Sequence, residues 1–361
     1  MRSAISVRLA AIVATFAMMA FAVGSARAAE TPPTHKEIVR AAIEKHILPH
    51  FDALKAATGP LPDAVRNVCK TGSPEARAAL DTAFANVVTA YAGVDYMRFG
   101  PMAERGRRER LSFWPDPRGF VGRQLRLILL NKDPAVLEPG AIAKQSVAVQ
   151  GLSALEVLIR DKAVPLGPGE AADYRCKLAE IIAKNIQTVA GEVTDAWEAP
   201  GGWRDTMEKA GPDNPVYKSD SEAAAETVKT LLMGMSLTSD LQIKPQIDPT
   251  LKLAGAYEKS GLQSAYYLAS IASLKNLFDT LKLQAYLPED KDWVMGWISG
   301  AWRAFLSTDG VGGRGPKAQE GRKTPPLREV FDKFVGMRKL ITGELCPDAR
   351  ITVGFNELDG D

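Results

Sequence analysis

Apolar residues recur at steps of three and four along most of the chain, which is the pattern of helices that bury one face. In residues 170–197, for example, Leu178, Ile182, Ile186 and Val189 form one stripe. Alternation typical of a strand is confined to residues 350–355. The pattern therefore predicts an all-α protein, with helices over residues 34–55, 74–97, 119–131, 139–161, 170–197, 219–243, 261–285, 290–307 and 326–342.

Residues 198–218 interrupt this pattern. They hold three prolines and three glycines, together with asparagine and aspartate turn signals, and are expected to form a long connector. The helical pattern after this connector repeats the character of the pattern before it. The sequence thus predicts two bundles of about four helices each, residues 29–200 and 201–361, related by pseudo-duplication and meeting at a cleft.

Residues 1–28 have the features of a cleavable signal peptide. Arg2 and Arg8 begin a basic, then apolar, stretch, and Ala26-Arg27-Ala28 is typical of a cleavage site. The apolar run is short and ends in small residues, which favours a signal peptide over a membrane anchor. Removal of residues 1–28 takes away three arginines and leaves 42 of the 45 basic residues against 43 acidic ones. No charge excess then remains to attract nucleic acid or anionic lipid. We expect an exported, periplasmic protein whose mature chain has no transmembrane segment.

The three cysteines, Cys69, Cys176 and Cys346, allow three pairings in an exported protein. Cys69 and Cys176 both fall in residues 29–200, whereas Cys346 precedes a proline in a predicted turn. The favoured disulfide therefore joins Cys69 and Cys176. No C-x-x-C spacing occurs, which argues against a zinc cluster.

The segment Gln-Gly-Leu-Ser-Ala-Leu-Glu-Val-Leu-Ile-Arg-Asp, residues 150–161, reads as a helix that is apolar nearly all round, and such a helix is buried. Ser153 and Glu156 are three residues apart and share one side of it. A carboxylate in this position needs a cation, hydrogen-bond donors or a raised pKa. Ser153 and Glu156 are therefore candidate site residues.

This segment resembles the G-x-H-x-x-E motif of the imelysin-like (peptidase M75-like) family, with Ser153 in place of the histidine. The stretches 98–101 (Arg-Phe-Gly-Pro) and 110–116 (Arg-Leu-Ser-Phe-Trp-Pro-Asp) also match that family, and residues 354–361 resemble the signature of the subgroup related to iron-regulated protein A. The resemblance covers essentially the whole mature chain. It implies an association with iron uptake and a cleft between two helical bundles, and the family's name implies a peptidase.

Four residues upstream are further candidates. Arg110 precedes Trp114 and Asp116, a setting typical of a fixed guanidinium, and Arg98 lies in a turn. Arg98 or Arg110 is a candidate partner for Glu156, and a buried ion pair of this kind is the structural alternative to a ligand site.

Other charged or basic residues are expected to be structural. Arg105, Arg107 and Arg108 are predicted to lie on a solvated helix face. His46 and His50 have the four-residue spacing of zinc ligands on a helix, but a proline lies between them and no further ligand motif accompanies them.

Ser260 and Ser264 lie at the start of the helix predicted over residues 261–285. They resemble the serine-rich segment of the family's second bundle, which faces the first bundle across the cleft. The alternative is that Ser260 is a simple N-cap beside a close-packing glycine.

Three functions remain open at this point. A metal-dependent peptidase is implied by the family name, but Ser153 is a poor zinc ligand and no H-E-x-x-H motif is present. A ligand-binding protein linked to iron uptake is the favoured function, with iron as the candidate cofactor and Glu156 as the candidate metal ligand, because hard cations prefer oxygen donors. The partner would then be iron, a small ligand or a periplasmic or membrane uptake protein. The third function is a scaffold that binds a peptide through Trp114 and Arg98.

Overall fold

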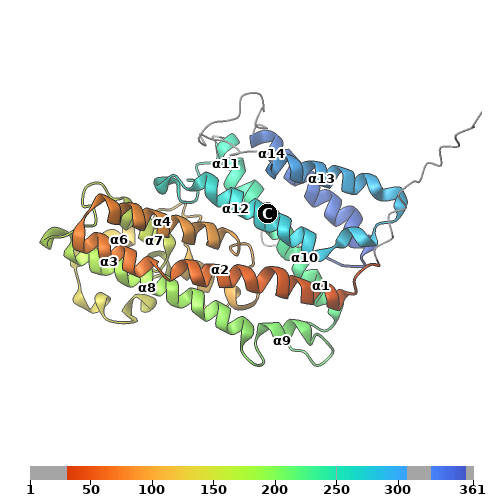
Figure 1. Ribbon diagram of the computed structural model, residues 1–361, viewed down its shortest axis with the longest axis horizontal. Coiled ribbons are helices and arrows are strands. Elements are labelled where there is room, and N and C mark those ends of the chain that lie inside the picture. Colours follow the sequence, from red (N-terminus) through yellow and green to blue (C-terminus); the bar gives the residue numbers. More distant parts are fainter. Residues whose placement is uncertain (1–30, 249, 307–326, 355–361) are drawn as a thin grey trace, which may run out of the picture. The chain divides into compact units, whose positions relative to one another are not determined.

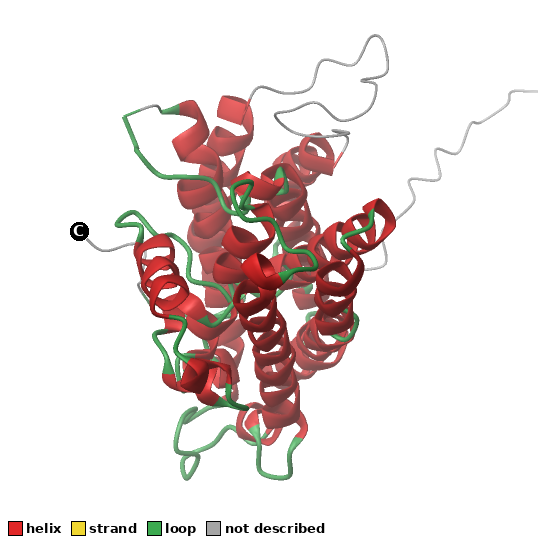
Figure 2. Ribbon diagram, turned by 90° about the vertical axis from the view of Figure 1, so that its left-hand side faces the viewer, coloured by secondary structure: helices red, strands yellow, loops and turns green. Residues whose placement is uncertain are grey.

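The computed structural model describes residues 31–248, 250–306 and 327–354. The described residues from Pro32 onward belong to one compact unit. The predicted signal peptide and residues 355–361 of the predicted C-terminal signature lie outside the described residues. Every regular element among the described residues is helical, which confirms the all-α class (Figure 2).

The α-helices of the described residues are α1 (His35–Ala42), α2 (Leu48–Thr58), α3 (Leu61–Thr71), α4 (Pro74–Ala92), α5 (Arg107–Leu111), α6 (Phe120–Asn131), α7 (Leu152–Arg160), α8 (Glu170–Glu198), α9 (Trp203–Glu208), α10 (Asp220–Ser236), α11 (Lys244–Ile247), α12 (Gln263–Leu281), α13 (Asp292–Leu306), α14 (Leu327–Leu340) and α15 (Cys346–Asp348).

The helices surround one continuous core of buried apolar residues, which extends from Ile38 in α1 to Ile351 after α15. Helices α2, α3, α4 and α8 pack together, and α7 lies against α8 (Figure 1). Helix α12 packs against α4, α10 and α13, and α13 also packs against α14. Because α1 packs against α10 and α12, the first helix of the chain contacts the second half. The division into residues 29–200 and 201–361 with a cleft stays a prediction.

Helix starts follow the local sequence. Ser73 caps α4, since its Oγ accepts a hydrogen bond of 3.2 Å from the backbone N–H of Ala76. Thr34 and Glu37 form a capping box at the start of α1. Helix α4 ends at Ala92, short of the predicted residue 97, where Gly93 lowers the helix propensity.

Three π-helical turns, Ile43–Ile47, Leu237–Ile243 and Ile341–Leu345, join α1 to α2, α10 to α11 and α14 to α15. In each case the next helix has a proline among its first two residues. Proline has no N–H to donate and its ring crowds the preceding turn, so the helix widens there instead of ending. The predicted continuous helix over residues 34–55 is therefore a helix with one wide turn.

The single helix predicted over residues 139–161 is wrong. Residues before Gly151 form 3₁₀ turns at Ala141–Lys144 and Val147–Val149, and only Leu152–Arg160 is α-helical. Gly140 has a φ of +75°, which ends regular structure there, and Gly151 has an extended backbone. The predicted connector also contains a helix, α9, and residues 350–354 form no strand.

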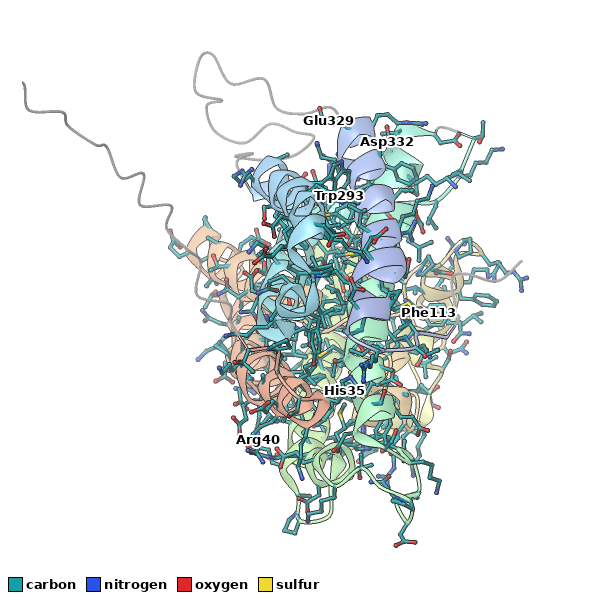
Figure 3. The ribbon with its side chains drawn as sticks, turned by 90° about the vertical axis from the view of Figure 1, so that its right-hand side faces the viewer. His35, Arg40, Phe113, Trp293, Glu329 and Asp332 are labelled. Carbon is teal, nitrogen blue, oxygen red and sulfur yellow. A yellow bond between two sulfur atoms is a disulfide. The ribbon has the colours of Figure 1, made fainter. Side chains whose placement is uncertain are left out.

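Two links join distant parts of the chain. The disulfide joins Cys69 of α3 to Cys176 of α8, the pair expected from the sequence, and Cys346 is a buried free thiol. His35 Nε2 lies 2.9 Å from the carbonyl oxygen of Ala349, so the start of α1 is joined to the segment after α15 (Figure 3). None of the described helices has the length and apolar character that crossing a membrane requires.

Candidate functional site

Helix α7 carries the motif, and the glycine just before it, Gly151, approaches another backbone segment closely. A Cβ on Gly151 would lie 2.3 Å from the carbonyl oxygen of Leu111 and 2.4 Å from that of Arg110. Only glycine permits this approach, so the glycine of the motif has a structural role. The expected burial of α7 on most faces is confirmed, because Leu152, Ala154, Leu155, Glu156, Leu158 and Ile159 are all buried.

Three hydroxyl groups from different segments meet beside α7. The Oγ atoms of Ser153 and Ser112 are 3.3 Å apart, and Ser112 Oγ lies 2.8 Å from the Tyr257 hydroxyl. Tyr257 is buried, which raises the pKa of its phenol well above the usual value, so the group is neutral. Its φ of +55° is unusual for a bulky residue and costs about 1–3 kcal/mol, and such strain is typical of sites where the surroundings fix one conformation.

Glu156 lies on the same side of α7 and is 7% exposed. Its Oε1 accepts a hydrogen bond of 2.8 Å from the backbone N–H of Ser260. Burial raises the pKa of the Glu156 carboxyl, although the hydrogen bonds from Ser260 and the charges of Lys259 and Arg160 act in the opposite direction. The motif carboxylate therefore holds the segment before α12 against α7.

Arg160, one turn further along α7, strengthens this contact. Its Nε donates to Ser260 Oγ at 3.0 Å, and its Nη1 lies 2.8 Å from Asp81 Oδ1. We call Ser112, Ser153, Glu156, Arg160, Tyr257 and Ser260 the motif network.

The expected N-cap role of Ser260 is wrong. Leu262 occupies the N-cap position of α12, and Ser260 ends a 3₁₀ turn that begins at Glu258. Ser260 instead contacts α7 directly, through its backbone N–H to Glu156 and its Oγ to Arg160. Ser264 lies in the first turn of α12.

A buried acid that the sequence did not single out adjoins the motif network. Asp95 accepts hydrogen bonds from the hydroxyls of Tyr91 at 2.9 Å and Tyr266 at 2.5 Å, and the Tyr266 ring lies 5.1 Å from that of Tyr257. Burial raises the pKa of all three phenols. Nothing in the sequence relates Tyr91 to Tyr266, a tyrosine far along the chain.

Arg110 does not pair with Glu156, so this expectation is wrong. Its Nη1 lies 3.2 Å from Glu192 of α8, and its Nε donates to Gln150 Oε1 at 3.1 Å. Arg98, the other expected partner, is half-buried in the turn after α4. The guanidinium next to the motif carboxylate belongs to Arg160, which the sequence did not select.

The expectation of a solvated Arg107 is also wrong. This side chain is 4% exposed, because Glu192 and the Pro101 carbonyl face it. Its Nη1 donates to Pro101 at 3.0 Å and its Nε lies 3.3 Å from Glu192. Arg107 and Arg110 thus share one carboxylate on α8, a position that only the packing of α5 on α8 creates.

Trp114 and Asp116 have local roles. The Asp116 carboxylate accepts hydrogen bonds of 2.8 and 2.9 Å from the backbone N–H groups of Phe120 and Val121, so it caps α6. Trp114 Nε1 donates to the carbonyl of Ala254 at 3.1 Å. None of these hydrogen bonds involves Glu156.

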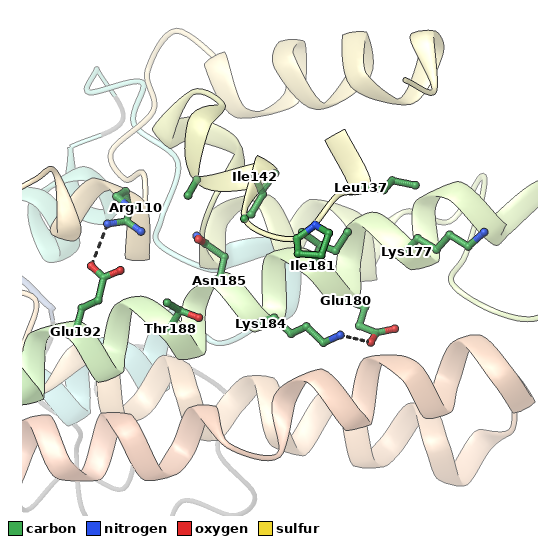
Figure 4. A pocket seen from close by; sticks show the side chains of 13 residues that line it. Arg110, Leu137, Ile142, Lys177, Glu180, Ile181, Lys184, Asn185, Thr188 and Glu192 are labelled. Atoms are coloured by element: carbon green, nitrogen blue, oxygen red, sulfur yellow. Dashed lines mark hydrogen bonds and ion pairs between the residues drawn. The ribbon is translucent and has the colours of Figure 1, made fainter. Parts of the chain in front are cut away.

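A cavity of about 470 Å³ lies along α8 (Figure 4). We call it the paired pocket, since its charged side chains have partners: Lys184 with Glu180, Arg110 with Glu192, and Lys177 with an aspartate outside the lining. Its remaining wall includes Ile142 and Ile181.

A second cavity, of about 520 Å³, lies among α6, α7, α8 and the segment before α12. We call it the basic pocket, with a wall that includes Arg126, Leu129, Lys132, Val157, Arg175 and Lys259. Val157 follows Glu156 in α7 and Lys259 precedes Ser260. The basic pocket therefore adjoins the motif network at two places, at Val157 in α7 and at Lys259 in the segment before α12.

The histidines belong to another buried cluster. His46 Nδ1 lies 2.7 Å from Asn276 Oδ1 and its Nε2 lies 2.8 Å from the Tyr96 hydroxyl, which in turn lies 2.7 Å from Ser273 Oγ. We call these four residues the histidine network. Burial lowers the pKa of His46 to about 3, so the ring is neutral. His50 Nδ1 donates to the carbonyl of His46 at 2.7 Å. Both rings are thus engaged within the fold.

The residues near Glu156 do not fit the expected metal ion. A hard cation needs several oxygen ligands, more than one of them charged. Glu156 instead has a backbone N–H and the cations Lys259 and Arg160 as neighbours, and the Tyr257 phenol is neutral. No group of three or more histidine, cysteine, aspartate and glutamate side chains in the described ranges is placed to hold a metal ion.

The solved structures that resemble this chain include an imelysin-like protein and an iron-regulated protein A precursor. An imelysin-like protein from Psychrobacter arcticum has a TM-score of 0.71 at 17% identity, with 89% of this chain and 97% of that chain covered. An iron-regulated protein A precursor from Parabacteroides distasonis has a TM-score of 0.59 at 12% identity, with the same coverage of 89% and 97%. At these identities the likeness shows the fold alone.

A search of curated proteins finds no match to this chain. The family model of imelysin, peptidase M75, matches residues 47–288, which include α7, the motif network and both pockets. The match spans about two thirds of the 361 residues. The chain therefore belongs to the imelysin family.

Proposed function

We propose that this chain is an exported, periplasmic imelysin-like protein that binds a small ligand in connection with iron uptake. The observation that carries the proposal is the position of Glu156, whose carboxylate accepts the backbone N–H of a residue 104 positions away. This contact orders the segment that places Lys259 on the basic pocket. Glu156 would therefore support ligand binding by keeping the wall of the basic pocket in place.

The hydroxyl of Ser153 supports the same choice. Its neighbour is the hydroxyl of Ser112, whereas a serine nucleophile needs an adjacent base. The export of the chain is inferred from residues 1–28. The link to iron rests on the resemblance to the iron-regulated protein A precursor, and we expect iron to arrive as an anionic complex because the residues near Glu156 disfavour a bare cation.

The alternative is a metal-dependent peptidase, which the name of the family favours. Purified wild-type protein and Glu156→Gln would be incubated with casein and small peptides, with and without Zn²⁺ or Fe²⁺. Thermal unfolding of both proteins would be measured with ferric citrate.

We expect no hydrolysis above background and an increase in the Tm of the wild-type protein with ferric citrate. Metal-dependent proteolysis by the wild-type protein that Glu156→Gln abolishes would overturn the proposal. So would the absence of any Tm change with ferric citrate.

A further inference from the structure

We propose that the basic pocket binds a small organic anion that has a carboxylate or phosphate group and an apolar portion. The inference rests on the proposed ligand-binding function and names the ligand class. It depends on the charges, the unused hydrogen-bond donors and the apolar wall of this pocket.

The charges of the basic pocket are unbalanced. Four cations, Arg126, Lys132, Arg175 and Lys259, line it together with one acid, Asp161. Arg126 and Lys132 are exposed and form no ion pair with a carboxylate of the described residues. The charge of Lys259 interacts with the buried carboxyl of Glu156. An anion in the pocket would therefore meet several cations at short range.

Asp161 does not compensate for this excess, because its carboxylate is already engaged. Oδ2 lies 2.9 Å from Arg175 Nη2, and Oδ1 accepts the backbone N–H groups of Ala163 and Val164 at 2.8 and 3.3 Å. The Arg175–Asp161 pair is thus internally neutral. The remaining positive charge of the wall is available to a ligand.

Arg175 also has unused hydrogen-bonding capacity. The residue is 8% exposed, and its Nη1 is buried without a hydrogen-bond partner. A buried donor without an acceptor is unfavourable. A ligand oxygen that reached Nη1 would satisfy it while Nη2 keeps Asp161.

The rest of the wall is apolar. Leu129, Val157 and Tyr174 contribute side chains, and Leu130, which is 72% exposed, also belongs to the wall. The volume of about 520 Å³ lies in the range of small-molecule sites. A ligand with both a charged group and a short apolar body fits this wall better than a free inorganic anion.

The paired pocket provides a matched control. Lys177 pairs with Asp173 and Lys184 with Glu180, each at 2.8 Å. Removing two cations there changes the net charge of the protein as much as removing two from the basic pocket. It leaves the basic pocket intact.

The test uses isothermal titration with octanoate, 1-octanol and inorganic phosphate. The proteins are the wild type, the double variant Arg126→Gln/Lys132→Asn, and the control Lys177→Gln/Lys184→Gln, each first checked for an unchanged Tm. We expect octanoate to bind the wild type and the control equally. Its affinity for the basic-pocket variant should be at least about tenfold lower. We expect 1-octanol and phosphate to bind more weakly than octanoate.

Equal octanoate affinity in the wild type and Arg126→Gln/Lys132→Asn would overturn the inference, as would equal affinity for octanoate and 1-octanol. Phosphate binding as tight as octanoate binding would overturn the apolar part. Each of these three results would leave the proposed function standing if ferric citrate still raises the Tm. Metal-dependent proteolysis would instead remove the function on which the inference rests.

Discussion

The histidine network and the motif network both join the first half of the chain to the region of α12, but they differ in what surrounds them. His46 is 0% exposed, and each member of the histidine network is buried apart from Asn276. In the motif network, Ser153, Arg160 and Ser260 are partly exposed, and Lys259 and Val157 continue directly into the basic pocket.

The difference indicates two kinds of role. A buried, neutral histidine with a partner on each ring nitrogen stabilises the fold. Glu156 is a buried acid whose sequence neighbour lines a cavity, so a ligand in that cavity can affect the backbone segment at Ser260 that Glu156 holds. The following predictions test this distinction, from the largest expected effect to the smallest.

Gly151→Ala should destabilise the protein by about 3 kcal/mol or more, because the new Cβ would overlap two backbone carbonyls that cannot move independently. The matched control is Gly191→Ala in α8, where a Cβ meets open space and should stabilise the helix by about 0.5–1 kcal/mol. Urea unfolding of the three proteins measures both changes. Equal stabilities for Gly151→Ala and the wild type would show that α7 does not depend on this close approach.

Acid should weaken the histidine network. Burial lowers the pKa of His46 to about 3 in the folded protein, while the unfolded value is near 6.5. The unfolded state therefore binds more protons between these values, and stability is lost as the pH falls from 6.5 towards 3. From pH 6 to pH 4 this loss amounts to about 2 kcal/mol.

The measurement is the pH dependence of the free energy of unfolding in the wild type and in His46→Gln. Carboxylates contribute to both curves and cancel in the difference. The variant should have the smaller slope over this range, and parallel curves would contradict a neutral His46 in the folded state.

Removing one tyrosine hydroxyl from each network should have unequal effects. Tyr96→Phe leaves His46 Nε2 buried without a partner and should cost about 2 kcal/mol. Tyr257→Phe removes a hydrogen bond to Ser112, which keeps Ser153 as a neighbour, and should cost about 1 kcal/mol. A larger loss for Tyr257→Phe in urea unfolding would reverse the distinction between the two networks.

Glu156→Gln should have the smallest effect on stability, within about 1 kcal/mol at pH 7. Burial raises the pKa of this carboxyl, so its charged form opposes folding as the pH rises through the folded-state pKa, and glutamine can still accept the Ser260 N–H. The stability of the variant relative to the wild type should therefore increase as the pH rises above the ordinary carboxyl pKa of about 4.3. A loss of more than about 2 kcal/mol at pH 7 would indicate that Glu156 is held as an ion pair with Arg160 or Lys259.

Several features of the site followed from the sequence, and others did not. Ser153 and Glu156 share a side of α7 as their spacing predicted, because a helix alone determines that geometry. The partner of Glu156 was predicted to be Arg98 or Arg110, yet Glu192 holds Arg110 and the chain before α12 supplies the backbone donor. An arginine in a sequence does not show which of several acids it will meet, because the choice depends on how two helices pack.

The sequence by itself determined the all-α class and most of the long helices, since apolar spacing acts over four or five residues and needs no information from elsewhere in the chain. Shared location within one half of the chain was enough to select Cys69 and Cys176. Only the tertiary structure decided that α7 begins after Gly151, that Arg107 is buried, and that Tyr257 and Ser260 complete the motif network. These residues lie 145 and 104 positions from Ser112 and Glu156, and contacts at such separations arise only when the whole core is packed.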